Sequence, residues 1–130
     1  MGYNEEYQSA QQDTVAYWEK QADRIDWYKK PATTITETDF GTYSWYPDGE
    51  LNSSYLALDR HIEAGNGDRV ALYYDSPATD SKAAITYSDL RDKVALFAGA
   101  LRQQGVEKGD TVVIYMPMIP EAAVAMLACA

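Results

Sequence analysis

The sequence predicts an α/β protein in which a helical and irregular N-terminal extension precedes the first strand–helix units of a layered domain. From Ile85 onward the predicted order is strand, helix, strand, helix, which is typical of a parallel sheet covered by helices. Before that point the chain reads as helices, irregular segments and one hairpin. We therefore divide the chain into an extension, residues 1–68, and the start of a larger domain, residues 69–130.

The extension begins with a predicted helix and a long irregular connection. In residues 5–25, apolar side chains recur at spacings of three, four and seven, and Pro31 follows soon after. Residues 29–50 have no sustained period and can include short strands. Because they hold four aromatic side chains, we expect this connection to lie against another surface.

A second helix is predicted over residues 52–64. Asn52 or Ser53 can cap its beginning, and the glycine-containing turn at residues 65–68 can end it. Residues 70–74 and 83–87 are β-like runs joined by a turn-rich link, so we expect them to form a hairpin.

The remaining elements have clear local signals. Thr86 and Asp89 have the spacing of a capping box, in which the Thr hydroxyl accepts a hydrogen bond from the backbone N–H of residue 89 and the Asp side chain reaches back. The helix that they open is predicted to end near residue 104, before Gly105. Residues 111–115 are almost uniformly apolar or β-branched, which predicts a central parallel strand. Pro120 suits the first position of a last helix.

The last predicted helix is apolar on every side. Such a helix is expected to be buried on every side, which favours a native chain that continues beyond Ala130. If residues 1–130 exist alone, we expect this apolar end to cause self-association.

Composition argues against several classes of protein. The net charge of −9 argues against nucleic acid and against an anionic membrane surface as partners. A single cysteine cannot form an internal disulfide, and the N-terminus lacks the basic and apolar segments of a signal peptide. We therefore expect a cytoplasmic protein in which Cys129 is a small core residue.

Residues that could carry chemistry have simpler structural explanations. His61 lies in a predicted helix with no second His or Cys to complete a metal site, so we expect it to pack or cap. The adjacent Asp59 and Arg60 are expected to pair with neighbouring surfaces. The pattern Gly65-x-Gly67 follows a helix and lacks the lysine of a phosphate loop. An aromatic binding platform is disfavoured because several of the rings have core-like helical spacing. The sequence therefore predicts no catalytic, cofactor-binding or metal-ligating residue.

Several short segments together carry a resemblance to one enzyme family. Residues 85–90, Ile-Thr-Tyr-Ser-Asp-Leu, resemble the first core motif of the adenylate-forming, AMP-binding superfamily. Residues 105–112 resemble the superfamily pattern Gly-Val-x-x-Gly-Asp-x-Val. Residues 116–130 carry the most specific resemblance, which is to the branch of acetyl- and propionyl-CoA synthetases. Residues 51–68 are similar to its Leu-Asn…Asp-Arg-His…Glu-Ala-Gly-x-Gly-Asp run. Residues 73–77 resemble the propionate-type members more than the acetate-type ones.

The resemblance covers about residues 15–130 and implies an acid–thiol ligase as the parent protein. Such enzymes use ATP and Mg²⁺ to convert propionate or acetate to an acyl-adenylate, and then transfer the acyl group to CoA. Their reacting residues lie on later motifs that this sequence lacks. The resemblance thus implies an inactive N-terminal fragment that binds no cofactor and whose partner is the remainder of the ligase. The alternative is a free-standing, truncated paralogue that acts as a protein-interaction module.

Overall fold

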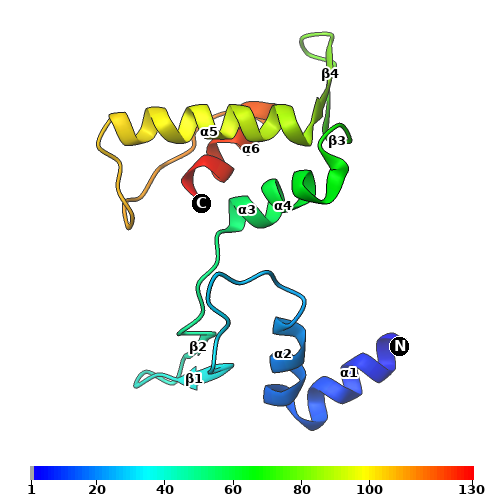
Figure 1. The fold of residues 1–130 in the computed structure, drawn as a ribbon, viewed down its shortest axis with the longest axis vertical. Coiled ribbons are helices and arrows are strands. Elements are labelled where there is room, and N and C mark those ends of the chain that lie inside the picture. Colours follow the sequence, from blue (N-terminus) through cyan, green and yellow to red (C-terminus); the bar gives the residue numbers. More distant parts are fainter. Residues whose placement is uncertain (1) are drawn as a thin grey trace. The chain divides into compact units, whose positions relative to one another are not determined.

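The computed structural model describes residues 2–130, which divide after Asn52 into two compact units. Unit 1 ends at Asn52, and unit 2 comprises residues 53–130. Figure 1 shows helices and short strands in both units, with unit 1 in blue to cyan and unit 2 in green to red. This mixture of helices and strands agrees with the predicted α/β class.

Unit 1 begins with two helices where the sequence predicted one. Helix α1 comprises Tyr3–Gln12 and helix α2 comprises Thr14–Ala22. Asp13 separates them because its backbone is extended and its carboxylate accepts a hydrogen bond from the Ala16 N–H at 2.9 Å. A short carboxylate that caps a new helix competes with continuation of the old one. The predicted single helix over residues 5–25 was therefore wrong.

The irregular connection of unit 1 contains a short hairpin. Strands β1 (Ile35–Glu37) and β2 (Tyr43–Trp45) pair antiparallel. The turn between them includes Gly41 at φ +69°, and Thr38 N–H donates to the Thr42 carbonyl at 2.8 Å. The short strands expected within residues 29–50 are thus confirmed.

Aromatic rings, rather than aliphatic side chains, hold unit 1 together. Trp45 lies between Trp18 and Tyr46, at ring-centroid distances of 5.8 and 6.1 Å. Trp27 meets Tyr46 at 5.4 Å, and the Tyr46 hydroxyl donates to the Trp18 carbonyl at 2.8 Å. Among the described residues of this unit, Ala22 is the only buried hydrophobic one. The expectation that these aromatics lie against another surface is confirmed within the unit for Trp45 and Tyr46, and it was wrong for Phe40, which is 93% exposed, and for Tyr43, which is 59% exposed.

Unit 2 opens with a broken helix. The segments are α3 (Ser53–Ala57), α4 (Asp59–His61) and the π-helical turn η1 (Ile62–Asn66). Leu58, between α3 and α4, has a non-helical backbone and is only 2% exposed. The predicted continuous helix over residues 52–64 was therefore wrong. The helix is interrupted at Leu58, where the chain turns and the side chain is buried.

The predicted hairpin and long helix are confirmed. Strands β3 (Val70–Ser76) and β4 (Ser81–Thr86) pair antiparallel, and α5 comprises Tyr87–Gln103. Gly105 follows with φ +87°, and Val106 N–H donates to the Leu101 carbonyl at 3.1 Å. This is the Schellman ending, in which a residue with positive φ satisfies the last helical carbonyls.

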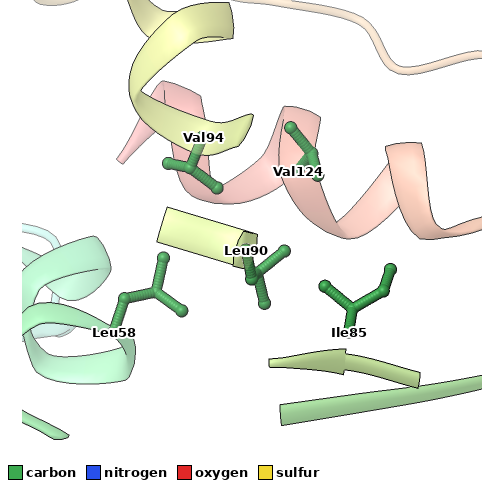
Figure 2. Packing of buried hydrophobic residues seen from close by; sticks show 5 residues of the cluster. All are labelled: Leu58, Ile85, Leu90, Val94 and Val124. Atoms are coloured by element: carbon green, nitrogen blue, oxygen red, sulfur yellow. The ribbon is translucent and has the colours of Figure 1, made fainter. Parts of the chain in front are cut away.

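The core of unit 2 lies where α5, α6, the broken helix and β4 meet. Helix α6 comprises Pro120–Cys129, with proline in its first turn as predicted. Figure 2 shows the buried side chains converging from these elements, and they are Leu58, Ile85, Leu90, Val94 and Val124. Removal of apolar surface from water stabilises unit 2 by on the order of 2 kcal/mol for each of these side chains.

The predicted parallel sheet was wrong for residues 2–130. Both sheets that the structure describes have two antiparallel strands, β1–β2 and β3–β4. Residues 111–115 form no strand, although their composition favours one. A strand is defined by its hydrogen-bonded neighbours, and within the described residues this run has no neighbouring strand.

Candidate functional site

The single histidine occupies a packed position in unit 2. His61 ends α4, and its ring centroid lies 5.2 Å from that of Tyr87 at the start of α5. This ring contact agrees with the packing role that the sequence favoured. Among residues 2–130, no group of three His, Cys, Asp or Glu side chains is placed to hold a metal ion.

The glycines of the Gly65-x-Gly67 pattern shape the chain instead of forming a loop around a phosphate. Gly65 lies inside η1 with φ +81°, a conformation that suits glycine. Gly67 packs against the start of α5, since a Cβ atom there would lie 2.7 Å from the Ser88 Oγ. Its carbonyl also accepts from the Ser88 N–H at 3.1 Å. Gly67 therefore serves the contact between the end of η1 and α5, and Gly65 supplies the positive φ inside η1.

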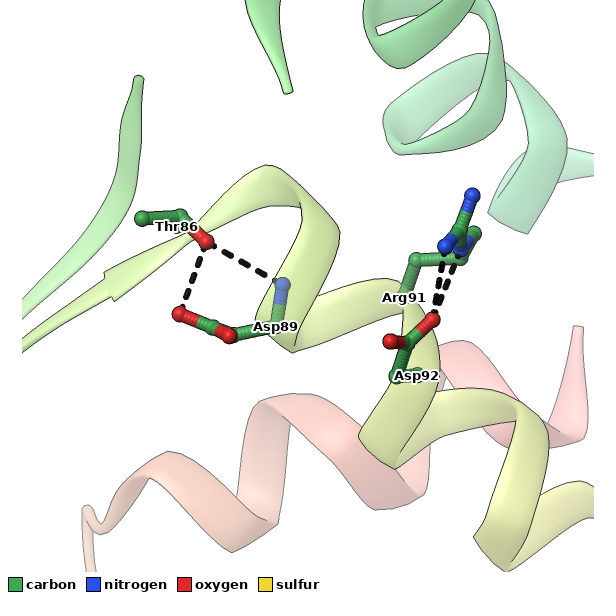
Figure 3. Close-up of polar contacts among 4 residues, drawn as sticks. All are labelled: Thr86, Asp89, Arg91 and Asp92. Atoms are coloured by element: carbon green, nitrogen blue, oxygen red, sulfur yellow. Dashed lines mark hydrogen bonds and ion pairs between the residues drawn. The ribbon is translucent and has the colours of Figure 1, made fainter. Parts of the chain in front are cut away.

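Helix α5 begins with the predicted cap in a modified form. The Thr86 hydroxyl oxygen accepts from the Asp89 N–H at 3.1 Å, as predicted. The Asp89 carboxylate accepts from the Thr86 hydroxyl at 2.7 Å, rather than from the backbone N–H expected for a capping box. Figure 3 shows these two contacts and, one turn further along, the pair between Arg91 and Asp92. The acidic side chain also suits the positive end of the helix.

Arg91 and Asp92 form an exposed ion pair that affects the pKa of Arg91. Two guanidinium nitrogens of Arg91 lie 2.7 and 3.0 Å from one carboxylate oxygen of Asp92. The hydrogen bonds and charge of Asp92, with a smaller contribution from Asp59, raise the pKa of Arg91. The pairing expected for Asp59 stays a prediction, because no ion pair of its side chain is described within residues 2–130. The pairing expected for Arg60 stays a prediction.

A hollow of about 450 Å³ lies beside the beginning of α5. It is lined by Ala83, Ala84, Ile85, Asp89, Asp92, Lys93 and Leu96. Its charged groups are two carboxylates and one ammonium, whereas ATP needs an excess of cations and N–H donors around its phosphates. The hollow therefore does not fit ATP.

Cys129 is exposed, whereas the sequence predicted that it would be buried in the core. The thiol belongs to an exposed residue in the last turn of α6, so the expectation of a core cysteine was wrong. Helix α6 buries Val124 and Ala125, while Met126 is 60% exposed. Within residues 2–130 only one face of this helix meets the unit 2 core, so its burial on every side in a longer chain stays a prediction.

The most unusual surface of unit 2 is the run between Gly109 and α6, which we call the apolar run, residues 111–118. It holds large hydrophobic side chains that are strongly exposed, including Val113 (83%), Tyr115 (98%) and Met118 (93%). Val112 is only partly exposed, so the run buries part of one side. An exposed β-forming run of this kind marks an interaction surface.

One polar residue of unit 1 was missed by the sequence interpretation. The Asp48 carboxylate accepts from the backbone N–H groups of Ala32 and Thr33 at 2.9 and 3.1 Å. The first of these bonds is the main reason that the pKa of Asp48 is lowered. The order Pro47-Asp48-Gly49 predicts a tight turn, but these two bonds reach backbone 16 and 15 residues away, so the local pattern gave no signal for them.

Comparison with known proteins identifies the family to which the chain belongs. The chain superimposes on acetoacetyl-CoA synthetase from Streptomyces lividans with a TM-score of 0.81 and 28% identity, over 98% of this chain and 20% of that one. An α/β architecture of acyl-CoA synthetases is thereby established. The family model for AMP-binding enzymes matches residues 58–130, and the model for the acetyl-coenzyme A synthetase N-terminus matches residues 3–57. The chain belongs to the AMP-binding enzyme family.

Curated relatives match the chain over 97–100% of its length. An uncharacterized protein of Pseudomonas aeruginosa is 51% identical over 130 residues, which are 100% of this chain and 21% of that protein. The mitochondrial acyl-CoA synthetase short-chain family member 3 of Rattus norvegicus is 49% identical over 98% of this chain and 19% of its own length. The acetyl-coenzyme A synthetase of Streptomyces coelicolor is 49% identical over 97% and 19%. The chain thus spans about a fifth of the length of the curated relatives it matches.

Proposed function

We propose that the chain is the N-terminal part of a short-chain acyl-CoA ligase, which joins a small carboxylate to CoA through an acyl-adenylate. The observation that carries this proposal is the succession of two family models, over residues 3–57 and 58–130, in the order of acetyl-CoA synthetases. Propionate is the favoured substrate because residues 73–77 resemble the propionate-type branch. ATP, Mg²⁺ and CoA are the cofactors proposed for the parent enzyme, whose reacting groups lie outside residues 1–130.

The role proposed for this chain is structural. Residues 1–68 form the extension and residues 69–130 begin the adenylation domain, although unit 1 ends at Asn52 and the two family models meet between residues 57 and 58. The apolar run is the surface on which the remainder of the ligase packs. Burying Val113 and Tyr115 there would stabilise the parent by on the order of 2 kcal/mol for each side chain.

The same apolar run supports the second candidate, a free-standing interaction module. In that case the run would contact a protein partner or a second copy of the chain, and self-association through it and α6 is proposed for isolated residues 1–130.

The parent is proposed to be cytoplasmic, without nucleic acid or membrane partners. Two observations bear on this: the net charge is −9, and no helix within residues 2–130 is both long and apolar enough to cross a membrane.

The size of the natural protein decides between the two candidates. An antibody raised against residues 1–68 should detect a band several times heavier than 14.5 kDa in source cells. A band at 14.5 kDa alone would reject the fragment and favour the interaction module. Fractionation of the same cells should place the heavy band in the cytosol, and enrichment in an organelle would contradict the proposed location.

Activity tests the enzymatic part of the proposal. The parent protein, captured with that antibody, should release pyrophosphate with ATP, Mg²⁺ and CoA, and should do so faster with propionate than with acetate. Faster turnover with acetate would reject the substrate while keeping the ligase. Purified residues 1–130 should show no turnover, and activity of this chain alone would contradict the placement of the reacting groups elsewhere.

A further inference from the structure

One face of unit 1 combines aromatic rings with a carboxylate. Ile35 pairs with Trp45 and Glu37 pairs with Tyr43 across the β1–β2 ladder, so these four side chains share one face of the hairpin. Trp18 of α2 meets the Trp45 ring edge to face at 5.8 Å and 76°. We call the set Trp18, Tyr43, Trp45 and Glu37 the aromatic–carboxylate surface.

The rings of this surface are accessible. Trp18, Tyr43 and Trp45 are 41%, 59% and 45% exposed, although each has a neighbour that holds it in place. Trp27 is different, because its indole N–H donates to the Ala22 carbonyl at 2.8 Å and its ring lies against Gly49. The sequence disfavoured an aromatic platform on the ground of core-like spacing. The exposure of these three rings reverses that argument for this face.

Charge indicates which partner would suit the surface. Unit 1 contains ten acidic and four basic residues in the sequence, a net charge of −6. Two of the four cations are engaged elsewhere, since Lys29 faces Glu50 and Lys30 pairs with Asp23. Glu37 is exposed, and its carboxylate has no hydrogen bond or ion pair within residues 2–130. A free carboxylate next to aromatic rings is complementary to a cation that also has a flat, apolar face.

We propose that the aromatic–carboxylate surface binds an arginine-bearing segment of a partner protein. A guanidinium can stack on the face of a tryptophan or tyrosine ring and at the same time donate two parallel hydrogen bonds to a carboxylate. Lysine offers a compact, strongly hydrated charge and lacks the planar fork, so arginine is preferred. The inference uses only unit 1 and does not depend on the enzymatic activity of the parent.

Titration of residues 1–130 with three matched peptides tests the inference. The probes are acetyl-Ala-Leu-Arg-Leu-Ala-amide, its lysine analogue and its neutral citrulline analogue, at constant ionic strength. The three indole N–H signals in the NMR spectrum report binding separately. We expect the arginine peptide to shift the Trp18 and Trp45 signals and to leave Trp27 in place, with weaker shifts from lysine and weaker still from citrulline.

A pair of charge-matched variants separates the surface from general attraction to an acidic protein. Glu37→Gln should weaken binding of the arginine peptide about threefold, and Glu107→Gln in unit 2, which changes the net charge equally, should leave it unchanged. Tyr43→Thr, which retains a strand-forming residue, should weaken binding to a similar extent. Equal losses in Glu37→Gln and Glu107→Gln, equal binding of the citrulline peptide, or no shift at Trp18 and Trp45 would overturn the inference.

Discussion

Unit 1 and unit 2 are stabilised by different kinds of side chain. In unit 1, half-exposed rings contact one another, Tyr46 and Trp27 donate hydrogen bonds to backbone carbonyls of the α2 region, and Asp48 accepts from backbone N–H groups of the irregular chain. In unit 2, aliphatic side chains from helices and a hairpin form a buried cluster around Leu58 and Leu90. Unit 1 therefore depends on the shape and polar ends of its aromatic residues, whereas unit 2 depends on filled volume.

This difference can be measured because the fluorescent residues are segregated. Trp18, Trp27 and Trp45, the three tryptophans of the chain, all belong to unit 1. Tryptophan fluorescence thus reports unfolding of unit 1, and hydrogen exchange of the α5 backbone reports unfolding of unit 2. Each substitution below should affect one signal and spare the other.

The largest effect is expected at Leu58. Its side chain is 2% exposed, and Leu58→Ala removes buried volume from a site that cannot fully collapse. We expect a loss of about 3 kcal/mol in the stability of unit 2, seen as faster exchange in α5 with unchanged tryptophan fluorescence. Leu96→Ala is the control, because Leu96 lies on α5, the helix whose exchange is measured, and is 78% exposed. A loss of equal size in both variants would contradict a localised core.

The corresponding change in unit 1 is Gly49→Ala. A Cβ atom at residue 49 would lie 2.8 Å from the Trp27 ring and 3.3 Å from Pro31 Cβ, so the ring must move. We expect unit 1 to lose about 1–3 kcal/mol, with an altered tryptophan emission spectrum and unchanged exchange in α5.

Gly99→Ala is the matched control for that substitution. Gly99 lies in the middle of α5 and a Cβ atom there meets nothing within 4 Å. Alanine should therefore stabilise unit 2 by about 0.5–1 kcal/mol through its higher helix propensity. If both glycine substitutions were neutral, close packing of Trp27 on Gly49 would not be part of the stability of unit 1.

A smaller effect is expected from the cap of α5. Thr86→Ala removes the hydroxyl that accepts from the Asp89 N–H, which should cost unit 2 about 1 kcal/mol. Thr86→Ser keeps the hydroxyl and should retain most of that stability. Denaturant unfolding followed by the far-ultraviolet helical signal would measure both, and identical stabilities of the Ala and Ser variants would show that the cap contributes nothing.

The smallest effect is expected on the stability of unit 1 at acid pH, through Asp48. Because the backbone N–H groups of Ala32 and Thr33 lower the pKa of Asp48 in the folded state, its contribution is complete above the ordinary carboxyl pKa of about 3.9. The contribution is lost as pH falls through the lowered folded pKa. Asp48→Asn should therefore flatten the acid limb of unit 1 stability, measured by tryptophan fluorescence between about pH 2 and 5. An acid limb identical to that of the original chain would rule out this linkage.

Local chemistry was predicted well where neighbouring residues decide the backbone. The cap at Thr86, the ending at Gly105 and the proline at the start of α6 all appeared as expected, because each depends on hydrogen bonds or torsions within a few residues. The break at Asp13 also has a local cause, but the apolar spacing of residues 5–25 concealed it. Periodicity averages over a window and does not register one competing cap.

The candidate interfaces were predicted less well because they depend on what surrounds a residue. The apolar run had the composition of a central strand, yet its strand state requires neighbours that residues 2–130 do not provide. The aromatic–carboxylate surface needed the register of β1 and β2 to place Glu37 beside Tyr43. Exposure of Cys129 likewise follows from which face of α6 meets the core.

The family, the hairpin β3–β4 and the limits of α5 could be predicted from residue order, since they follow from motifs and from short-range torsional and hydrogen-bond preferences. The rings that support unit 1, the buried face of α6 and the interruption of a helix at Leu58 became known from the folded chain. Burial is a property of a residue and all of its spatial neighbours, and a one-dimensional pattern does not specify those neighbours.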